Sequence, residues 1–379
     1  MKIAHVVTLV SPDGAFGGPV RVATNLARAM QDAGHEVTIL GSHRGYDLPP
    51  TQLEGVPARL FPARRLLPGL GFSGLVSPGL LAHLHRHIAE FDIVHLHLAR
   101  DLVTLPSALL ARRRGVPYVT QTHGMIDASR RRLAHVLDAL ATRTVLRQAP
   151  TLFHLTEQER DDLVQVARTS SLPLAQLPNG VPVSKLQADV ESGREVLFLA
   201  RLHAVKRPLA FVEAAIALKE QFPETRFTLV GPDEGEAADV MHRIESANAG
   251  GAISWEGSLA PSQTLERMSR ASIYVLPSIE ELFPMSVLEA MSIGLPTIVT
   301  DTCGLIPELH DPNAVVVVNS SLDGLVTELK RLLSDPTARV ALGDQARREV
   351  EDRFSIYNIA AIATSAYRSV TSQAERLEL

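Results

Sequence analysis

The chain has a single cysteine, Cys303, among its 379 residues. One cysteine forms no internal disulfide and supplies no multi-cysteine metal site, so a fold stapled by disulfides is excluded. Aromatic residues make up only 4% of the chain, and no uninterrupted apolar run reaches the ~20 residues that a membrane-spanning helix needs. These shortages indicate a globular protein of a reducing compartment, and we expect it in the cytoplasm.

The chain is too long for one ordinary core, and apolar residues make up 45% of it, enough to build more than one. At roughly 150 residues per domain, this length favours two domains. The apolar run at 3–10 is followed by Ser11-Pro12-Asp13-Gly14, which contains no small-residue cleavage site. We therefore expect this run to be the first buried strand and not a signal peptide.

Charge is distributed unevenly along the chain, whose net charge is −5. Residues 1–183 carry 19 basic and 14 acidic residues, whereas residues 184–379 carry 18 and 28. A mildly basic first half suits an anionic membrane surface or a phosphorylated acceptor, but it also fits ordinary surface charge. No basic block with interleaved aromatic residues is present, so nucleic acid is not an expected partner.

Short apolar runs rich in β-branched residues alternate with segments of helical periodicity. The runs lie at residues 3–10, 37–40, 93–98, 118–122, 152–155, 196–200, 227–230, 253–255, 273–276, 297–300 and 315–318. This alternation predicts an α/β fold with parallel sheets and helices on both faces. The pattern restarts near residue 195, so we expect two facing Rossmann-like, doubly wound domains with a central cleft.

The predicted domains are residues 1–183 and 184–355, with an interdomain linker at residues 183–194. A final helix over roughly 356–379 returns to the first domain. Doubly wound domains bind ligands at the carboxyl ends of their strands. Residues that carry chemistry are therefore expected directly after the predicted strands.

Two carboxylates, Glu281 and Glu289, follow the strand predicted at 273–276. Because Pro284 can occupy the first turn of a helix, where a missing N–H has no effect, we expect a helix from about Pro284. Glu281 then lies on the preceding loop, and Glu289 lies just over one turn inside the helix. The free N–H groups at such a helix start can hold an anion such as a pyrophosphate.

Two basic residues, Arg201 and Lys206, follow the first strand of the second half, ahead of a helix predicted to open near Pro208. A guanidinium fork and an ammonium group at this place can neutralise a departing pyrophosphate. Taken alone, the pair fits a solvated surface equally well. Its position at a strand end, ahead of the two glutamates, favours the anion site.

A glycine pair, Gly17 and Gly18, follows the first strand, and a helix is predicted from Pro19. Paired glycines let the backbone approach a phosphate at a helix N-terminus, although a plain tight turn has the same pattern. The dinucleotide fingerprint Gly-x-Gly-x-x-Gly is absent, and no acidic residue closes the second strand near Leu40.

In their order along the chain, these motifs resemble those of the retaining glycosyltransferases of family 4. The resemblance covers nearly the whole chain and rests on Gly17-Gly18, Pro178-Asn179-Gly180-Val181, Arg201-x4-Lys206 and Glu281-x7-Glu289. It implies the GT-B architecture of two Rossmann-like domains, the first binding the acceptor and the second the nucleotide-sugar donor. It also implies transfer of a sugar with retained anomeric configuration.

The resemblance assigns roles to these residues. It implies that Arg201 and Lys206 grip the donor diphosphate, that Glu281 contacts hydroxyls of the transferred sugar, and that Glu289 holds the ribose. It also implies that His123, in Thr122-His123-Gly124-Met125, polarises the reacting region of the sugar or positions its 6-hydroxyl.

Other implied contacts lie around the donor. Phe283-Pro284-Met285-Ser286 presents backbone N–H groups to the phosphates, and Gly231 and Leu259 fall where the family holds the nucleobase. The expected catalytic residues are thus His123 and Glu281. The expected donor-binding residues are Gly17, Gly18, Arg201, Lys206, Gly231, Leu259, Phe283, Pro284, Met285, Ser286 and Glu289.

Two positions depart from the family pattern: Leu282 stands where a small residue is common, and Pro182 where an aspartate often follows. Neither change removes a charged group of the expected site. No metal or other cofactor is expected, because fixed positive charge can offset the diphosphate and no clear Asp-x-Asp motif ends a strand.

Two clusters have alternative interpretations. His83 and His87 have a metal-ligand spacing on a helix, although His95 and His97 fit a buried strand better. The segment 130–147 is either a basic amphipathic helix lying on an anionic membrane or an ordinary helix packed on the sheet. A catalytic role for Cys303 would need a base partner that the sequence does not offer.

The expected function is that of a retaining hexosyltransferase using a nucleotide-diphosphate sugar and a glycan or lipid-linked acceptor. It would serve cell-surface polysaccharide or glycolipid biosynthesis in the cytoplasm or at the cytoplasmic face of the membrane. Two alternatives stay open: a sugar-nucleotide epimerase or hydrolase on the same fold, and a non-catalytic nucleotide-sugar-binding protein. The sequence specifies neither the sugar, the base nor the acceptor.

Overall fold

The computed structural model describes residues 1–12, 17–66, 71–129 and 132–378. Its internal contacts divide the chain into two compact units. Unit 1 comprises residues 1–180 and 356–379, and unit 2 comprises residues 181–355. The predicted boundary after residue 183 falls just inside unit 2.

Unit 1 is built on a sheet with the strand order β10-β9-β8-β7-β1-β2-β4-β3. The strands are β1 (Lys2–Val10), β2 (Glu36–His43), β3 (Gln52–Leu53), β4 (Val56–Pro62), β7 (Ile93–His97), β8 (Tyr118–Gln121), β9 (Leu152–His154) and β10 (Leu174–Gln176). Neighbouring strands pair in parallel except β3 and β4. The order reverses between β1 and β7, which makes this pair a topological switch point.

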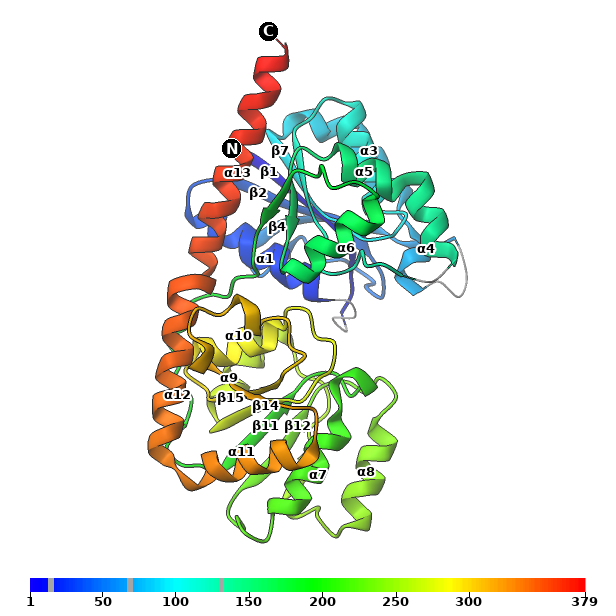
Figure 1. Cartoon of the computed structure of the whole chain (residues 1–379). Helices are drawn as coiled ribbons and strands as arrows, with labels where there is room; N and C mark the ends of the chain where they lie inside the picture. Colours follow the sequence, from blue (N-terminus) through cyan, green and yellow to red (C-terminus); the bar gives the residue numbers. More distant parts are fainter. Residues whose placement is uncertain (13–16, 67–70, 130–131, 379) are drawn as a thin grey trace. The chain divides into compact units, whose positions relative to one another are not determined.

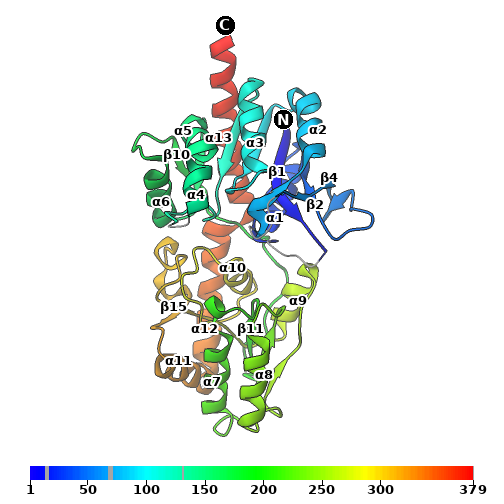
Figure 2. The same ribbon diagram turned by 90° about the vertical axis from the view of Figure 1, so that its right-hand side faces the viewer.

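Helices cover both faces of this sheet. On one face, α1 (Gly17–Asp32) and α13 (Ile356–Glu378) lie side by side (Figure 1). The other face packs against α2 (Pro78–His87), α3 (Thr104–Arg113), α5 (Arg143–Gln148) and α6 (Glu157–Ala167). Figure 2 shows α2 and α3 beside each other. Between α3 and α5 in sequence lie α4 (Arg132–Leu137) and a π-helix (Asp138–Thr142).

Strand β1 shows how the sequence places the sheet between two layers. Ile3 and Val7 pack in the cluster that contains α1 and α13, whereas Ala4 and Val6 pack in the cluster that contains α2 and α3. All four side chains are fully buried. A nearly continuous apolar run is what a parallel strand covered on both faces requires.

Unit 2 has six parallel strands in the order β13-β12-β11-β14-β15-β16. They are β11 (Glu195–Leu199), β12 (Arg226–Val230), β13 (Ile253–Trp255), β14 (Ile273–Leu276), β15 (Thr297–Thr300) and β16 (Val316–Val318). The switch point of this Rossmann order lies between β11 and β14.

Helices α7 (Pro208–Leu218), α8 (Ala237–Ser246) and α11 (Leu322–Ser334) share one hydrophobic core with the sheet of unit 2, and α7 lies between α8 and α11 (Figure 1). Helix α10 (Met285–Ser292) packs against β14 and β15, with α9 (Thr264–Ser269) and α12 (Pro336–Glu349) beside it. The predicted α/β architecture with two Rossmann-like units is confirmed.

The chain passes between the units twice, at residues 180–181 and 355–356. The backbone N–H of Val181 donates to the carbonyl of Phe354 at 2.9 Å, so the two crossings are tied together. Gly180 leaves no room for a side chain, because a Cβ there would lie 2.9 Å from Cα of Ile356.

The predicted linker at residues 183–194 is wrong, because hydrogen bonds fasten this segment to unit 2. The N–H groups of Ala188 and Asp189 donate to the carbonyls of Ile293 and Ser269, each at 3.0 Å. The buried guanidinium of Arg339 donates to the carbonyl of Val190 at 2.6 Å.

Two further parts differ from the sequence prediction. Strand β4 is not predicted, because Pro57 and Pro62 and partly exposed side chains obscure its pattern. Segment 66–81, for which no strand is predicted, contains the short strand β6 (Leu75–Val76), which pairs with β5 (Arg64–Arg65), and the start of α2; residues 67–70 lie outside the described residues. In the described part of the chain, no helix is long and apolar enough to cross a membrane.

Candidate active site

The expected donor-binding residues of unit 2 follow four neighbouring strands. Arg201 follows β11, Gly231 follows β12, Leu259 follows β13, and Glu281 follows β14. Because the strands are parallel, these residues lie at the same edge of the sheet. Arg201 and Glu281 follow the two strands that flank the switch point.

The loops after β11 and β14 are joined to each other. The N–H of Ile279 donates to the carbonyl of Val205 at 2.9 Å. Close to this hydrogen bond, the ammonium group of Lys206 forms an ion pair with the carboxylate of Glu281. Their side chains are only 15% and 17% exposed. The sequence predicted both residues but not the contact between them.

Lys206 ends a short 3-10 helix (Ala204–Lys206), and α7 begins at Pro208 as predicted. Arg207 between them has a left-handed backbone (φ +54°) and donates to the carbonyl of Ser320 at 2.8 Å. Arg201 lies further out: its side chain is half exposed and pairs with Glu234 at 2.5 Å. The ion pair of Lys206 is thus mostly buried, whereas the ion pair of Arg201 lies near solvent.

Helix α10 begins at Met285, one residue after the predicted start, with Pro284 as its cap. The hydroxyl of Tyr274 lies 2.8 Å from Oγ of Ser286 and 3.0 Å from the carbonyl of Leu199. It therefore connects the helix start with the end of β11. Burial raises the pKa of Tyr274, so the phenol stays neutral. Tyr274 was not predicted, because within a buried strand it gives no separate sequence signal.

The remaining residues of this segment have different surroundings. Glu289 lies inside α10 and is only 4% exposed. The ring of Phe283 is buried and packs edge-on against Phe354, with centroids 6.0 Å apart. The Phe283 side chain thus anchors the turn, and Met285 and Ser286 are the partly exposed residues of the helix start.

Two glycines are required by close backbone contacts. Gly231 has φ +146°, and a Cβ there would lie 2.0 Å from the carbonyl oxygen of Ala200. A Cβ on Gly304 would lie 2.4 Å from the carbonyl oxygen of Leu282. The N–H of Gly304 donates to the carbonyl of Glu281 at 2.7 Å. Gly304 therefore holds the loop that carries Glu281, a role that the sequence did not reveal.

In unit 1, the predicted glycine pair is the first turn of α1, which begins at Gly17 and not at Pro19. A Cβ on Gly18 would meet no atom within 4 Å, so packing within the described residues does not require glycine there. The preceding residues 13–16 of the expected phosphate loop lie outside the described residues.

His123 follows β8 in a left-handed backbone conformation, with φ +51°. The carboxylate of Glu159 accepts hydrogen bonds from the two residues that flank His123: from the hydroxyl of Thr122 at 2.6 Å and from the N–H of Gly124. It also accepts from the N–H of Leu155 at 2.6 Å. Burial raises the pKa of Glu159 despite these bonds. Glu159, which the sequence did not single out, clamps the turn that carries His123.

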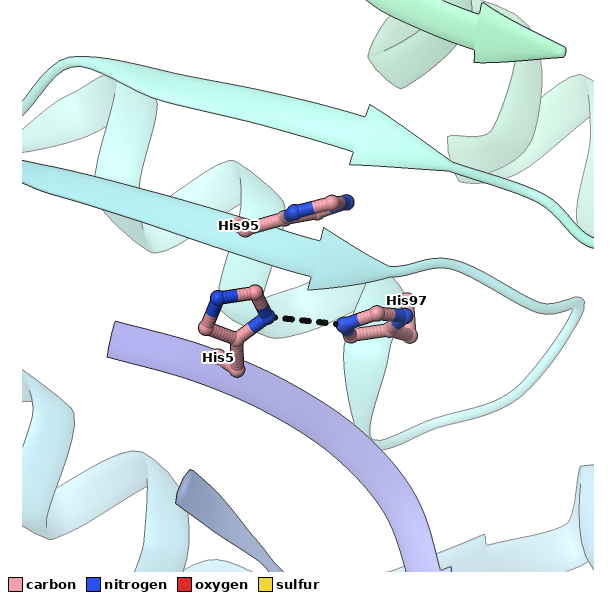
Figure 3. Close-up of side chains that lie close together, drawn as sticks. All are labelled: His5, His95 and His97. Carbon is pink, nitrogen blue, oxygen red and sulfur yellow. Dashed lines mark hydrogen bonds between the residues drawn. The ribbon is translucent and has the colours of Figure 1, made fainter. Parts of the chain in front are cut away.

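The side chain of His123 contacts a second histidine. Nε2 of His123 lies 2.7 Å from Nδ1 of His97, and Nε2 of His97 lies 3.0 Å from Nδ1 of His5 (Figure 3 shows the second contact). Burial lowers the pKa of His5 and His123 to about 3 and holds that of His97 well below its usual value. The three rings are therefore uncharged at neutral pH.

His83 and His87, the pair with a metal-ligand spacing, lie apart from the histidines that the structure groups together. His83 and His87 lie on α2 with ring centroids 4.6 Å apart, but within the described ranges the grouped metal-type ligands are His5, His95 and His97. Cys303 is buried, and burial raises the pKa of its thiol to about 11. A thiol with so high a pKa agrees with the inert interpretation.

Solved structures share the architecture of the whole chain. HepE from Anabaena in complex with UDP superposes with a TM-score of 0.77 and 16% identity, covering 97% of this chain and all of that one. Sucrose-phosphate synthase from Thermosynechococcus elongatus gives a TM-score of 0.75 and 17% identity, covering 98% of this chain and all of that one. At these identities the likeness establishes the fold, which is the GT-B fold.

Family descriptions match both units. Residues 17–180 match the "Glycosyl transferase 4-like domain", and residues 185–349 match "Glycosyl transferases group 1". Together the two matches span most of the chain. Each half of the chain therefore carries a glycosyltransferase domain, and the chain is an enzyme of the transferase class, as the motifs predict.

Curated relatives are similar over nearly their full length. The GDP-mannose:cellobiosyl-diphosphopolyprenol alpha-mannosyltransferase of Xanthomonas campestris is 26% identical, covering 98% of this chain and 95% of the relative. A D-inositol 3-phosphate glycosyltransferase of Nocardiopsis dassonvillei is 27% identical, covering 89% and 86%. The resemblance to the family is confirmed, while the roles of the individual site residues stay predictions.

Proposed function

We propose that this glycosyltransferase moves a sugar from a nucleotide-diphosphate donor to a glycan or lipid-linked acceptor, with retention of the anomeric configuration. The observation that carries the proposal is the contact of Lys206 with Glu281 at the switch point of unit 2. A relative whose name includes GDP-mannose and a diphosphopolyprenol acceptor supports this donor and acceptor chemistry.

The Lys206–Glu281 pair suggests how a donor is received. Without a ligand, the ammonium and carboxylate groups neutralise each other in a mostly buried place. A diphosphate that enters there carries more negative charge and replaces the carboxylate as the partner of Lys206. Glu281 is then released to accept hydrogen bonds from hydroxyls of the transferred sugar.

The rest of the donor lies along the same sheet edge in this proposal. Arg201 and the start of α10 share the diphosphate with Lys206, and Glu289 holds the ribose. Gly231 and Leu259, which follow the next two strands, border the base. Fixed positive charge then stabilises the departing diphosphate, and no divalent cation is needed.

The chemical step needs no protein nucleophile. The acceptor hydroxyl attacks the anomeric carbon on the face that the diphosphate leaves, and its proton passes to a phosphate oxygen of the departing group. One carbon–oxygen bond forms and one breaks, so configuration is retained. His123 is proposed to hydrogen-bond an oxygen atom of the donor sugar.

Peripheral membrane contact is proposed for the segment that runs from α4 to α5. Leu140 and Val136 are 75% and 50% exposed on it. Two of its arginines are engaged elsewhere, since Arg143 and Arg147 donate to carbonyls of α6 at 3.1 and 2.7 Å. Apolar insertion and not charge is therefore the main expected attraction. Vesicles containing anionic lipid should retain the wild type and release Leu140→Ser, and equal retention would contradict this contact.

The experiment that tests the function is an assay with a panel of nucleotide sugars and polyprenyl-diphosphate or glycan acceptors. Proton NMR of the isolated product should give the same anomeric configuration as the donor, and excess EDTA should leave the rate unchanged. An inverted product would contradict retention. A changed sugar without an acceptor would favour the epimerase alternative, and donor binding without any product would favour a non-catalytic protein.

A further inference from the structure

A chain of three histidines runs through the sheet of unit 1 and ends at His123. His5 lies within β1, His97 is the last residue of β7, and His123 follows β8. These are neighbouring strands, in the order β8-β7-β1. Hydrogen-bond distances of 3.0 Å and 2.7 Å join the rings in sequence. The chain thus connects the interior of the sheet with the expected catalytic residue.

Each hydrogen bond in this chain holds one proton between two nitrogen atoms. Burial keeps all three imidazoles neutral, so each ring has one N–H and one bare nitrogen. Moving the proton of one ring to its other nitrogen would therefore require both hydrogen bonds to reverse. The three tautomers are linked.

Two proton arrangements satisfy both hydrogen bonds. In one, His5 donates to His97 and His97 donates to His123, which leaves an N–H on Nδ1 of His123. In the other, every proton is reversed, which leaves an N–H on Nε2 of His5. Neither of these end atoms has a hydrogen-bond partner in the part of the chain that the structure describes.

The surroundings of the two ends decide between the arrangements. Nε2 of His5 and Nδ1 of His123 are both buried atoms, but His5 is fully buried as a residue, whereas His123 is partly exposed. Buried N–H groups without a partner are rare in proteins. The arrangement that places the unpaired N–H at His123, the partly exposed residue of the two, is therefore favoured.

We propose that His97, supported by His5, is the positioning residue that fixes the orientation and tautomer of His123, so that its Nδ1–H is offered to an oxygen atom of the donor sugar. Glu159 holds the residues on both sides of His123. The backbone of His123 is therefore fixed by Glu159, and its ring is fixed by His97. The functional part rests on the proposed function, but the tautomer can be measured without any substrate.

The alternative occupant of this region is a metal ion held by His5, His95 and His97, whose ligand atoms lie within 4.8 Å of one another. The rings of His95 and His97 are stacked, with centroids 4.5 Å apart and planes inclined by 12°. Stacked rings direct their nitrogen lone pairs in parallel, whereas metal ligands converge on one point. His5 and His97 also face each other directly (Figure 3). The geometry thus favours the hydrogen-bonded chain.

NMR of the full chain labelled with ¹⁵N, without substrate, shows which nitrogen atom of each imidazole carries the proton. The NMR signals of the His123 ring are assigned as those that are missing from the spectrum of His123→Asn. We expect a protonated Nδ1 and a bare Nε2 in the wild type. His97→Asn keeps an amide near the position of Nδ1 and should preserve this tautomer. His97→Gln places its amide near the position of Nε2 instead, and His123 should then show a mixture of tautomers.

His95→Asn is the matched control. His95 lies on the same strand as His97 and is equally buried. Its hydrogen bond goes to the hydroxyl of Tyr367, at 2.6 Å, and not to the other three histidines. The His123 signals should be unchanged in this variant. Thermal unfolding and circular dichroism of the variants separate an altered tautomer from a failure to fold.

Turnover gives a second readout. In His97→Gln we expect kcat to fall about tenfold with little change in the donor KM, and His97→Asn should recover most of it. The proposal is overturned by Nε2–H on His123 in the wild type, by identical His123 signals in His97→Gln, or by stoichiometric zinc in untagged protein. If no nucleotide sugar is turned over, the proposed function fails while the NMR result still decides this proposal.

Discussion

The contact between Lys206 and Glu281 is informative at the scale of single residues because each side chain is assigned to a different part of the donor. A mostly buried ion pair loses much of its hydration, so breaking it without a replacement is unfavourable. A diphosphate is such a replacement for Lys206, and a sugar hydroxyl is one for Glu281. In the proposed function, the pair therefore links donor binding to the release of Glu281.

Substitution of either residue should lower turnover strongly. We expect Lys206→Ala and Glu281→Ala each to reduce kcat/KM by about 10²–10³, because each removes a charged contact to the donor. Since the two side chains touch, the double variant should be less impaired than the product of the two effects. Steady-state kinetics with the best donor of the panel measures this, and wild-type turnover in either single variant contradicts the assignment.

What the sequence reveals at this scale is limited to residues that follow a strand directly. Arg201, Lys206 and Glu281 are charged residues after apolar runs, and such positions can be recognised without a structure. Tyr274 and Glu159 cannot, because their partners lie 12 to 75 and 4 to 37 residues away in sequence. Contacts of that kind depend on the packing of whole strands.

At the scale of elements, the loop after β12 is held against the end of β11 by the absence of a side chain at Gly231. Gly231→Ala would force its Cβ into the carbonyl of Ala200 and impose a strained φ. We expect a loss of about 1–3 kcal/mol of unfolding free energy and a weaker donor affinity.

Gly250→Ala is the control for this prediction. A Cβ there would meet no atom within 4 Å. Urea denaturation of both variants gives the comparison, and calorimetric titration with the donor gives the affinities. If Gly231→Ala matched Gly250→Ala in both measurements, the close contact would have no importance for the loop.

Elements were predictable where periodicity and boundary residues agree. Helix α7 begins at Pro208 and β1 is mostly apolar, so both follow from local sequence. Strand β4 and the segment 183–194 do not, because their structure comes from pairing with distant residues. The latter segment is polar enough to read as a linker, yet backbone hydrogen bonds to α9 and to the residue after α10 hold it on unit 2.

At the scale of the whole molecule, the buried histidines make stability depend on pH. His5, His95, His97 and His123 have their pKa lowered by burial from the usual 6.5, to about 3 for His5 and His123. As pH falls below 6.5, the unfolded chain binds protons that the folded chain cannot bind. His5 and His123 should each lower the free energy of unfolding by roughly 2 kcal/mol between pH 6.5 and 5, and His95 and His97 act in the same direction.

Two buried carboxyls act in the opposite direction. Burial raises the pKa of Asp101 and Glu159, so the folded chain binds their protons at higher pH than the unfolded chain does. They oppose four histidines, and we still expect a net loss of stability. Denaturation curves at several pH values should show it, with a shallower dependence in His5→Phe and an unchanged one in His85→Ala. Constant or rising stability on acidification contradicts this expectation.

The most direct test of the central claim, that the strand ends of unit 2 hold a nucleotide-diphosphate sugar, is ligand-induced thermal stabilisation of the full chain. At 100 times its Kd, the correct donor should stabilise the wild type by about 2.7 kcal/mol. Lys206→Ala should lose most of this effect at the same concentration, whereas Lys330→Ala, which removes an exposed ammonium group from α11, should keep it. Equal stabilisation of Lys206→Ala and the wild type by every nucleotide sugar that binds would contradict the account.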